Sequence, residues 1–285
     1  MIKKDPFPFE KIAVAVALSP SIEEIICKAV FFAKKFNAEL LFIHIKRNEK
    51  EDIQKMNQLI ERHASGISYT MEMESGDVVE SILAITKKHS IDLLIAGALE
   101  KESYLRYYLG SVSRKLSRKA KCSVLLLKEP SLNPKPFIRL VVNGAENPKT
   151  IHTLETAIYF SQGEEASEIY LVKENELSGL ATLINEDFED NKCNYRNQII
   201  SEEYAKLYNL LKKVRTSGSE VKPILLDGKP GYELSCFARS IKADLLVVNS
   251  ADSRKGFLDR IFPDDLEYVL ENLPCSLLIV HSRVS

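Results

Sequence analysis

The sequence predicts an α/β protein made of two tandem doubly wound domains, each built on a five-stranded parallel sheet. One observation is an internal repeat: IDLLIAG at 91–97 answers ADLLVVN at 243–249. The closing segments repeat as well, since KCSVLLLK at 121–128 answers PCSLLIVH at 274–281. The other observation is that short apolar runs of strand length alternate with segments of helical periodicity. Strands buried on both faces that alternate with helices are typical of a parallel sheet covered by helices.

The first copy carries these elements in a regular order. Residues 11–18 (KIAVAVAL) form a continuous apolar run, and a Ser-Pro-Ser segment then leads into a helical stretch that starts at Ile22. The further strands are expected at 39–46, 67–73, 91–97 and 122–128, and the further helices at 50–64, 77–89 and 111–120.

The second copy repeats this order after a linker. Its strands are expected at 138–143, 168–173, 220–226, 243–249 and 275–281. The segment SLNPKPF at 131–137 has two prolines and predicts the linker between a first domain, 1–130, and a second, 138–285, with the boundary near Lys135. The second copy also has a polar, acidic insertion near 174–195, for which we expect an added helix or a mobile flap.

Composition and charge exclude several classes of protein. A hydrophobic fraction of 45%, a charged fraction of 28% and a net charge of −1 indicate a folded globular chain. They give no general attraction to nucleic acid or to an anionic membrane. No apolar run approaches the ~20 residues that cross a bilayer, and the start MIKKDPFPFEK lacks the apolar stretch of a signal peptide. A cytoplasmic protein is therefore expected.

The cysteines and histidines do not predict a metal site. The five cysteines contain no CxxC pair, no histidine stands at ligand spacing from them, and the five histidines are scattered along the chain. We expect the cysteines to be buried apolar residues and the histidines to be surface or strand-end residues, with neither a zinc site nor a disulfide framework.

Two segments of the first copy carry a resemblance to a known family. GDVVESILAITKKHSIDLLIAG at 76–97 and GSVSRKLSRKAKCSVLLL at 110–127 resemble the universal stress protein (UspA-like) family, and the resemblance extends over nearly all of both halves. It implies a Rossmann-like sheet of the adenine-nucleotide α-hydrolase-like class and a role in the stress response. In the nucleotide-binding branch of the family, a loop written G-x2-G-x9-G-[ST] holds the phosphates of ATP.

The first copy matches this loop in part. Gly97, Gly110 and Ser111, followed by Val112, stand at motif positions, whereas Glu100 replaces the second glycine. A Gly-rich loop that enters a helix presents bare N–H groups to an anion. Glu100 adds a negative charge at that place. The resemblance therefore implies ATP or another adenine nucleotide as the candidate ligand of the first copy, through an incomplete motif.

Other residues of the first copy leave alternatives open. Lys101, Arg106 and Arg114 could offset Glu100 or form a solvated basic face, and Ser111 could equally be an ordinary helix-cap serine. The first strand ends in Ala15–Leu18, where nucleotide-binding members carry an Asp. Ile45, at the end of the second strand, is a candidate contact for an adenine or a plain core residue.

The second copy departs from the motif in the opposite way. Asn143 and Gly144 stay close to the family's strand-end pattern, but Asn249 and Asp252 replace the loop glycines. The following helix opens with a proline and two acids, at 263–265, which would repel a phosphate. This second site is predicted to be degenerate.

The sequence favours a regulatory module without catalytic activity, because no nucleophile with a base, carboxylate pair or metal cluster can be read from it. Asp92 and Asp244 open strands at equivalent positions, which favours a structural role. Two alternatives remain: a protein-interaction module without nucleotide, and an ATP-hydrolysing or nucleotidyl-transferring enzyme. The apolar last strands of the copies, 122–128 and 275–281, are expected to pair as an internal pseudo-dimer. A homodimer and the identity of any protein partner stay open.

Overall fold

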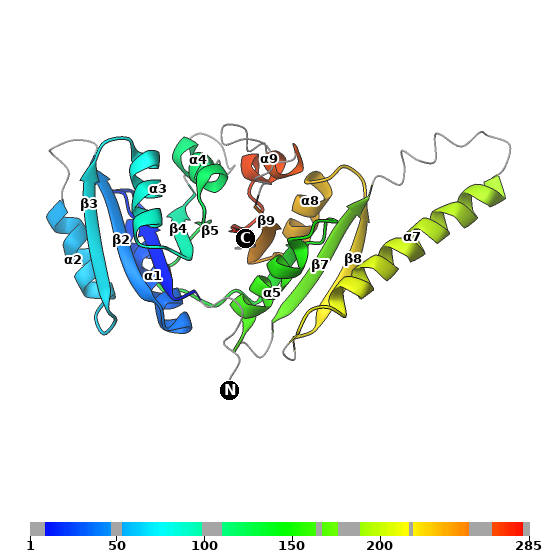
Figure 1. Cartoon of the computed structure of the whole chain (residues 1–285), viewed down its shortest axis with the longest axis horizontal. Helices are drawn as coiled ribbons and strands as arrows, with labels where there is room; N and C mark the ends of the chain where they lie inside the picture. The colour runs from blue at the N-terminus through cyan, green and yellow to red at the C-terminus, as the bar shows by residue number, and fades with distance from the viewer. Residues whose placement is uncertain are drawn as a thin grey trace. The chain divides into compact units, whose positions relative to one another are not determined.

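The computed structural model describes residues 9–46, 53–98, 110–163, 167–175, 189–216, 219–250 and 264–281. The chain divides into two compact units. The first contains strands β1 to β5 and also β10, the last described strand, and the second contains β6 to β9. Strands and helices alternate along most of the chain (Figure 1).

The first unit is a mostly parallel sheet in the order β3-β2-β1-β4-β5-β10. Its strands are β1 (Lys11–Ala15), β2 (Glu39–Lys46), β3 (Tyr69–Ser75), β4 (Leu93–Gly97), β5 (Ser123–Leu127) and β10 (Ser276–Val280). Its helices are α1 (Ile22–Phe36), α2 (Ile53–His63), α3 (Val78–Lys88) and α4 (Ser111–Lys119). Strand β10 runs antiparallel to β5, with Leu278 opposite Leu125. The expected pairing of the two last strands is confirmed.

The second unit repeats this plan in the order β9-β6-β7-β8. Its strands are β6 (Arg139–Asn143), β7 (Glu168–Asn175), β8 (Val221–Asp227) and β9 (Leu245–Asn249). Its helices are α5 (Thr150–Ser161), α7 (Glu189–Leu211), α8 (Tyr232–Ser240) and α9 (Asp264–Glu271). All pairs among these four strands are parallel. The predicted α/β fold with parallel sheets is therefore confirmed.

Helices cover both faces of the first unit's sheet. Successive side chains of a strand point to opposite faces, so β2 contributes to two apolar layers. Leu41, Ile43 and Ile45 pack toward α3 and α4, in a cluster that includes Val79 and Leu116. Helices α1 and α2 pack against each other, and α1 also contacts β1, β2 and β4. The central strands are consequently buried, whereas the outer strands β3 and β8 are only partly covered.

Local signals explain where individual helices begin and end. Asp77 caps α3, because its side chain accepts hydrogen bonds from the N–H groups of Val79 and Glu80 at 3.0 and 2.9 Å. Helix α1 has acids in its first turn and lysines in its last, which suits the helix dipole. It ends at Asn37, which takes the left-handed conformation (φ 51°) common at helix ends.

Asp92 and Asp244 perform the same structural task in the two units. The Oδ2 of Asp92 accepts hydrogen bonds from the N–H groups of Glu10 and Lys11, at 2.9 and 2.8 Å. The Oδ2 of Asp244 accepts from Ile138 and Arg139 at the same two distances. Each carboxylate thus holds the start of the neighbouring strand, β1 or β6, and the predicted structural role is confirmed.

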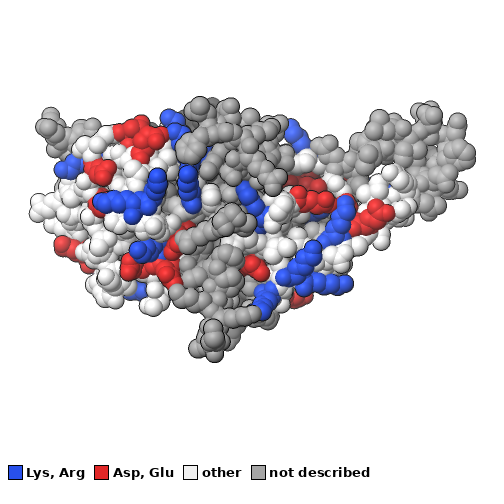
Figure 2. All heavy atoms as spheres, in the orientation of Figure 1, with Lys and Arg blue, Asp and Glu red and all other residues white. Residues whose placement is uncertain are grey.

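The predicted insertion is described in part. Strand β7 continues to Asn175, residues 176–188 lie outside the described residues, and α7 begins at Glu189. Helix α7 has 23 residues, against 11 in α2, its counterpart in the first unit. None of the described helices is long and apolar enough to span a membrane. On the face drawn in Figure 2, acidic and basic side chains occur beside one another, as the net charge of −1 suggests.

Candidate functional site

In each unit the candidate site lies at the carboxyl ends of the strands, where open parallel sheets bind ligands. In the first unit, β1 pairs in parallel with β2 on one side and with β4 on the other. Strands β2 and β3 extend the sheet on one side of β1, and β4 and β5 extend it on the other, so the strand order changes sides between β1 and β4. Gly97 ends β4, and Gly110 and Ser111 begin α4. Residues 99–109 lie outside the described residues, and with them the candidates Glu100, Lys101 and Arg106.

Gly97 joins β4 to two helices. A Cβ at this position would lie 2.7 Å from Cδ1 of Ile25, so the glycine lets α1 approach the strand end. On the other side, the hydroxyl of Ser113 donates a 3.1 Å hydrogen bond to the carbonyl of Gly97. This bond ties the first turn of α4 to β4. Gly97 therefore has a packing role besides its place in the motif.

The N-terminus of α4 has the features of an anion site. Gly110 is its N-cap, and no described side chain caps this helix end. Its first turn contains no acidic residue, and Ser111 is exposed. In contrast, the N-terminus of α3 is capped by Asp77. Free N–H groups and the positive end of the dipole are the features by which helix N-termini bind anions such as phosphate.

Ile45 and Val112 lie in one apolar cluster. Ile45 is 6% exposed and packs among the core residues of β2 and α3, and Val112 packs against the same cluster. The structure therefore gives Ile45 partners within the protein core. Arg114 is half-buried in α4.

The end of β1 offers no carboxylate, as the sequence indicated. The N–H of Val16 donates to the carbonyl of Ile43 at 2.9 Å, so the backbone continues the sheet beyond Ala15. His44 is 2% exposed, and its Nδ1 lies 3.0 Å from the carbonyl oxygen of Val16. His44 is therefore buried near the carboxyl end of β2, so the strand-end alternative holds for it and the surface alternative does not.

In the second unit the end of β6 is closely packed. The N–H of Gly144 donates to the carbonyl of Val172 at 2.7 Å. A Cβ on Gly144 would lie 3.1 Å from that oxygen and 3.2 Å from side-chain atoms of Leu171 and Leu207. Asn143 is turned to its own loop, because its Oδ1 accepts from the N–H of Ala145 at 2.9 Å. Both residues stabilise the chain itself.

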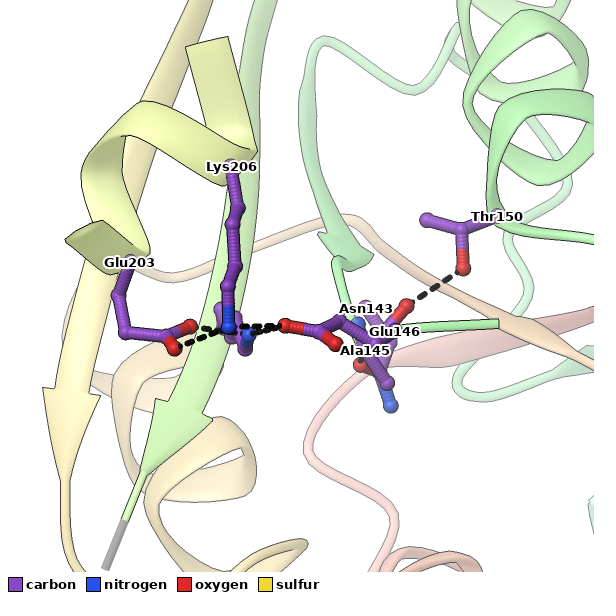
Figure 3. A network of polar contacts seen from close by, with 7 residues as sticks. Asn143, Ala145, Glu146, Thr150, Glu203 and Lys206 are labelled. Carbon is purple, nitrogen blue, oxygen red and sulfur yellow. Dashed lines mark hydrogen bonds and ion pairs between the residues drawn. The ribbon is translucent and has the colours of Figure 1, made fainter. Parts of the chain in front are cut away.

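Two buried threonines bridge the ends of β6 and β9. The hydroxyl of Thr150 donates to the carbonyl of Ala145 at 2.7 Å (Figure 3). The same hydroxyl accepts from the Asn249 side-chain amide at 3.1 Å. Thr153 donates to the Oδ1 of Asn249. Both threonines are completely buried. The Asn249 side chain at the end of β9 is therefore bound by two threonines of α5. A ligand at this strand end would have to compete with them for the same polar groups.

An ion-pair cluster lies beside these threonines. Lys173 of β7 contacts Glu203 of α7 and Glu146, which follows β6, the latter at 2.6 Å. Lys206 contacts Glu203 at 2.8 Å and Glu146 at 2.9 Å (Figure 3). The Lys173 and Glu203 side chains are only 9% and 10% exposed. Hydrogen bonds from Lys173 and then Lys206 lower the pKa of Glu146 to about 2, and hydrogen bonds to Glu203 and then Glu146 raise the pKa of Lys206.

No local sequence pattern predicts the contacts that close this strand end. Thr150 and Thr153 lie one turn apart at the start of α5, which is a readable signal, but their partner Asn249 is far along the chain. Asp252 and Pro263 lie outside the described residues, and α9 begins at Asp264.

The fold and the described strand ends define a class of protein, a tandem α/β chain in which the ends of β6 and β9 are filled by the protein's own side chains. The family model described as "Universal stress protein family" matches residues 46–128 and 153–281. The chain belongs to the universal stress protein family, which confirms the resemblance.

Similar proteins agree with this family. A curated universal stress protein from Methanocaldococcus jannaschii is 25% identical over 144 residues, covering 43% of this chain and 84% of that protein. A solved universal stress protein from Archaeoglobus fulgidus has a TM-score of 0.67 at 16% identity and covers 97% of this chain and 100% of its own. A functionally unknown protein from Pseudomonas aeruginosa has a TM-score of 0.68 at 15% identity, covering 95% and 92%. These two structures share the fold.

Proposed function

We propose that this chain is a cytoplasmic regulatory module of the stress response whose first unit binds an adenine nucleotide, while its second unit has given up that role. The proposal rests mainly on one contrast between the units. The N-terminus of α4 has neither a described cap nor an acid in its first turn, whereas the strand ends of the second unit are occupied by the protein's own side chains.

The first unit supplies a phosphate site rather than a complete nucleotide site. Ser111 and the first N–H groups of α4 would bind the phosphates, with Gly110 allowing close approach. The nucleoside would have few polar contacts, because the end of β1 has no carboxylate and Ile45 is packed in the core. We therefore expect weak binding, with an affinity carried largely by the phosphates.

The second unit supports a structural or protein-interaction role. A ligand between β6 and β9 would have to displace Asn249 from two buried threonines, and each broken buried hydrogen bond costs about 1–3 kcal/mol. The alternative function, an interaction module without nucleotide in either unit, is favoured by Ile25, which fills the space beside Gly97. The described residues of this site give no support to an enzymatic function.

The test is an equilibrium titration of the full chain with ATP and magnesium, followed by the unfolding temperature. Saturating ligand should stabilise the chain by about 2.7 kcal/mol at a concentration 100 times the Kd. Ser111→Asp should weaken binding at least about tenfold, because its carboxylate occupies the positive helix end, and the exposed position should tolerate the change.

Lys115→Gln is the matched control. Lys115 is an exposed residue of the same helix, so this variant makes the same change in net charge without placing a carboxylate at the helix start. Binding that Ser111→Asp and Lys115→Gln weaken equally would point to nonspecific charge. A complete lack of stabilisation at millimolar ATP would contradict nucleotide binding and leave the interaction module.

A further inference from the structure

A cysteine, a histidine and a glutamate are aligned between α1 and α2 of the first unit. Glu23 and Cys27 lie one turn apart on α1, at the i, i+4 spacing that places two side chains on the same helix face. His63, the last residue of α2, lies between them. Its Nδ1 is 3.3 Å from the Cys27 Sγ, and its Nε2 is 2.7 Å from Oε1 of Glu23.

This order of groups is that of an activated nucleophile. An Nε2–H donated to the Glu23 carboxylate leaves Nδ1 as the acceptor that faces the thiol, so the glutamate fixes the orientation of the ring. The arrangement does not suit a metal ion, because the two ring nitrogens point to different partners. In agreement, the described residues contain no group of three or more potential ligands that could hold a metal.

The cluster lies at the edge of the α1–α2 contact. The Cys27 residue is 7% exposed, and the side chains of His63 and Glu23 are 24% and 31% exposed. Arg62, on α2, lies 3.6 Å from Glu23 and is largely exposed. Burial, followed by the charges of Glu23 and Glu24, raises the pKa of the Cys27 thiol. At neutral pH the thiol is therefore protonated, and its reaction requires a base.

We propose that Cys27 is a modification site that reacts with low-molecular-weight disulfides, with His63 as the general base and Glu23 as a positioning residue. His63 takes the thiol proton at Nδ1 while the Cys27 sulfur attacks one sulfur of the disulfide. The new S–S bond joins Cys27 to one half of the reagent, and the old S–S bond breaks. The other half leaves as a thiolate and takes up a proton. Cys27 is oxidised, and the leaving sulfur is reduced.

The same geometry gives the modification a structural effect. The α2 residues Met56 and Ile60 are almost completely buried, so the helix fits closely where it packs. Because Cys27 is only 7% exposed and its Sγ lies 3.3 Å from His63, we expect a bulky group on the sulfur to push the end of α2 outward. Modification should therefore increase amide hydrogen exchange in α2, whereas exchange in β5, farther along the sheet order, stays unchanged.

The test follows the reaction of the full chain with oxidised glutathione, using mass spectrometry to measure each cysteine-containing peptide. Cys122 is the internal comparison: burial raises the pKa of its thiol to about 12, and it packs against an apolar cluster. Cys27 should react at least about 100-fold faster than Cys122 at pH 7. This factor is the low end of the rate increase that a general base typically provides. Cys27→Ser should abolish the adduct and the change in α2.

His63→Asn separates the base from a merely structural contact. The Asn side chain can still accept a hydrogen bond but does not take up a proton near pH 7. We expect the reaction of Cys27 to slow about 100-fold at pH 7 and to approach the wild-type rate once the pH exceeds the thiol pKa. Glu23→Ala should slow the reaction, and Glu23→Gln, which keeps an acceptor for the ring, should restore much of the rate.

Three outcomes would overturn the proposal or one of its parts. Equal rates for wild type and a folded His63→Asn variant over the whole pH range would overturn the role of the base. Modification of Cys122 in preference to Cys27 would overturn the site. A rate deficit in His63→Asn that persists unchanged at high pH would show that the histidine only keeps α2 in place.

Discussion

Replacing Lys173 with methionine removes the buried cation at the centre of the second unit's ion-pair cluster. Methionine has a similar length and fills much of the same space, so the change is mainly one of charge. The Glu203 side chain, 10% exposed, would lose its contact with Lys173. Breaking a buried ion pair by removing one partner leaves the other charge poorly compensated.

The structure sets the size of the effect. Loss of one partner of a fully buried pair costs about 3–5 kcal/mol. Here Lys206 keeps its 2.8 Å contact with Glu203, so the carboxylate is still paired, although by a side chain that is 52% exposed. We therefore expect Lys173→Met to destabilise the second unit by about 2–3 kcal/mol at pH 7, below the range for a fully buried pair.

The measurement must report on the second unit alone, because a chain of two units need not unfold in one step. The chain contains no tryptophan, so a single tryptophan provides a specific fluorescence signal. Tyr208 of α7 is 53% exposed and is a suitable position for it. Urea unfolding of Tyr208→Trp with and without Lys173→Met gives the difference in free energy of unfolding.

The pH dependence supplies a second readout. Lys173 and Lys206 lower the pKa of Glu146 to about 2. For Glu203, burial would raise the pKa, but the hydrogen bonds to the same lysines outweigh it and the pKa is lowered. A carboxylate with a lowered pKa stabilises the fold above its unfolded pKa, near 4.5, and this contribution is lost as the pH falls toward 2. The difference between wild type and Lys173→Met should therefore shrink between pH 5 and pH 3.

Two results would refute this reasoning. A Lys173→Met variant as stable as the parent at pH 7 would show that the cluster contributes nothing to the fold. A difference that stays constant down to pH 3 would show that the loss comes from packing rather than from charge. The double variant Lys173→Met/Glu203→Leu should recover stability relative to the single variant, since no buried charge is left without its partner.

Two further predictions concern the strand starts and the end of the chain. Asp92→Ala and Asp244→Ala should each destabilise their own unit by about 2 kcal/mol, because two backbone N–H groups lose their acceptor. The Asn variants keep an acceptor oxygen and should cost less. Equal losses for the Ala and Asn variants in urea unfolding would contradict this explanation. A chain cut after Lys135 lacks β10 and leaves the edge of β5 uncovered, so it should self-associate in size-exclusion chromatography at micromolar concentration. A stable monomer would argue against a protective role of β10.

The sequence predicted the strands well where apolar runs have clear ends. Residues 39–46 were expected as a strand and form β2 with the same bounds, because Asn37 ends α1 directly before it. The apolar run 11–18 predicts a strand that is longer than the observed β1, which stops at Ala15. Leu18 is apolar but 40% exposed, and apolarity alone does not mark the residue at which a chain leaves the sheet.

The site was predicted less completely, because its contacts join distant parts of the chain. The motif residues Gly97 and Gly110 could be placed at the end of a strand and at the start of a helix from spacing alone. The bond between Thr150 and Asn249, however, spans 99 positions, and no local pattern indicates it. The same holds for Cys27 and His63: the helix spacing that pairs the cysteine with Glu23 is readable, but the histidine comes from another helix.

The position of β10 also affects how the protein is made. This strand is the last of the chain, yet it pairs with β5 in the first unit. A ribosome that adds about 5–20 residues per second needs roughly 7–30 s to pass from the end of β5 to the start of β10. During that time the emerging first half presents an open apolar strand edge to other nascent chains and to chaperones. The sheet of the first unit is therefore complete only after the second half of the chain has been synthesised.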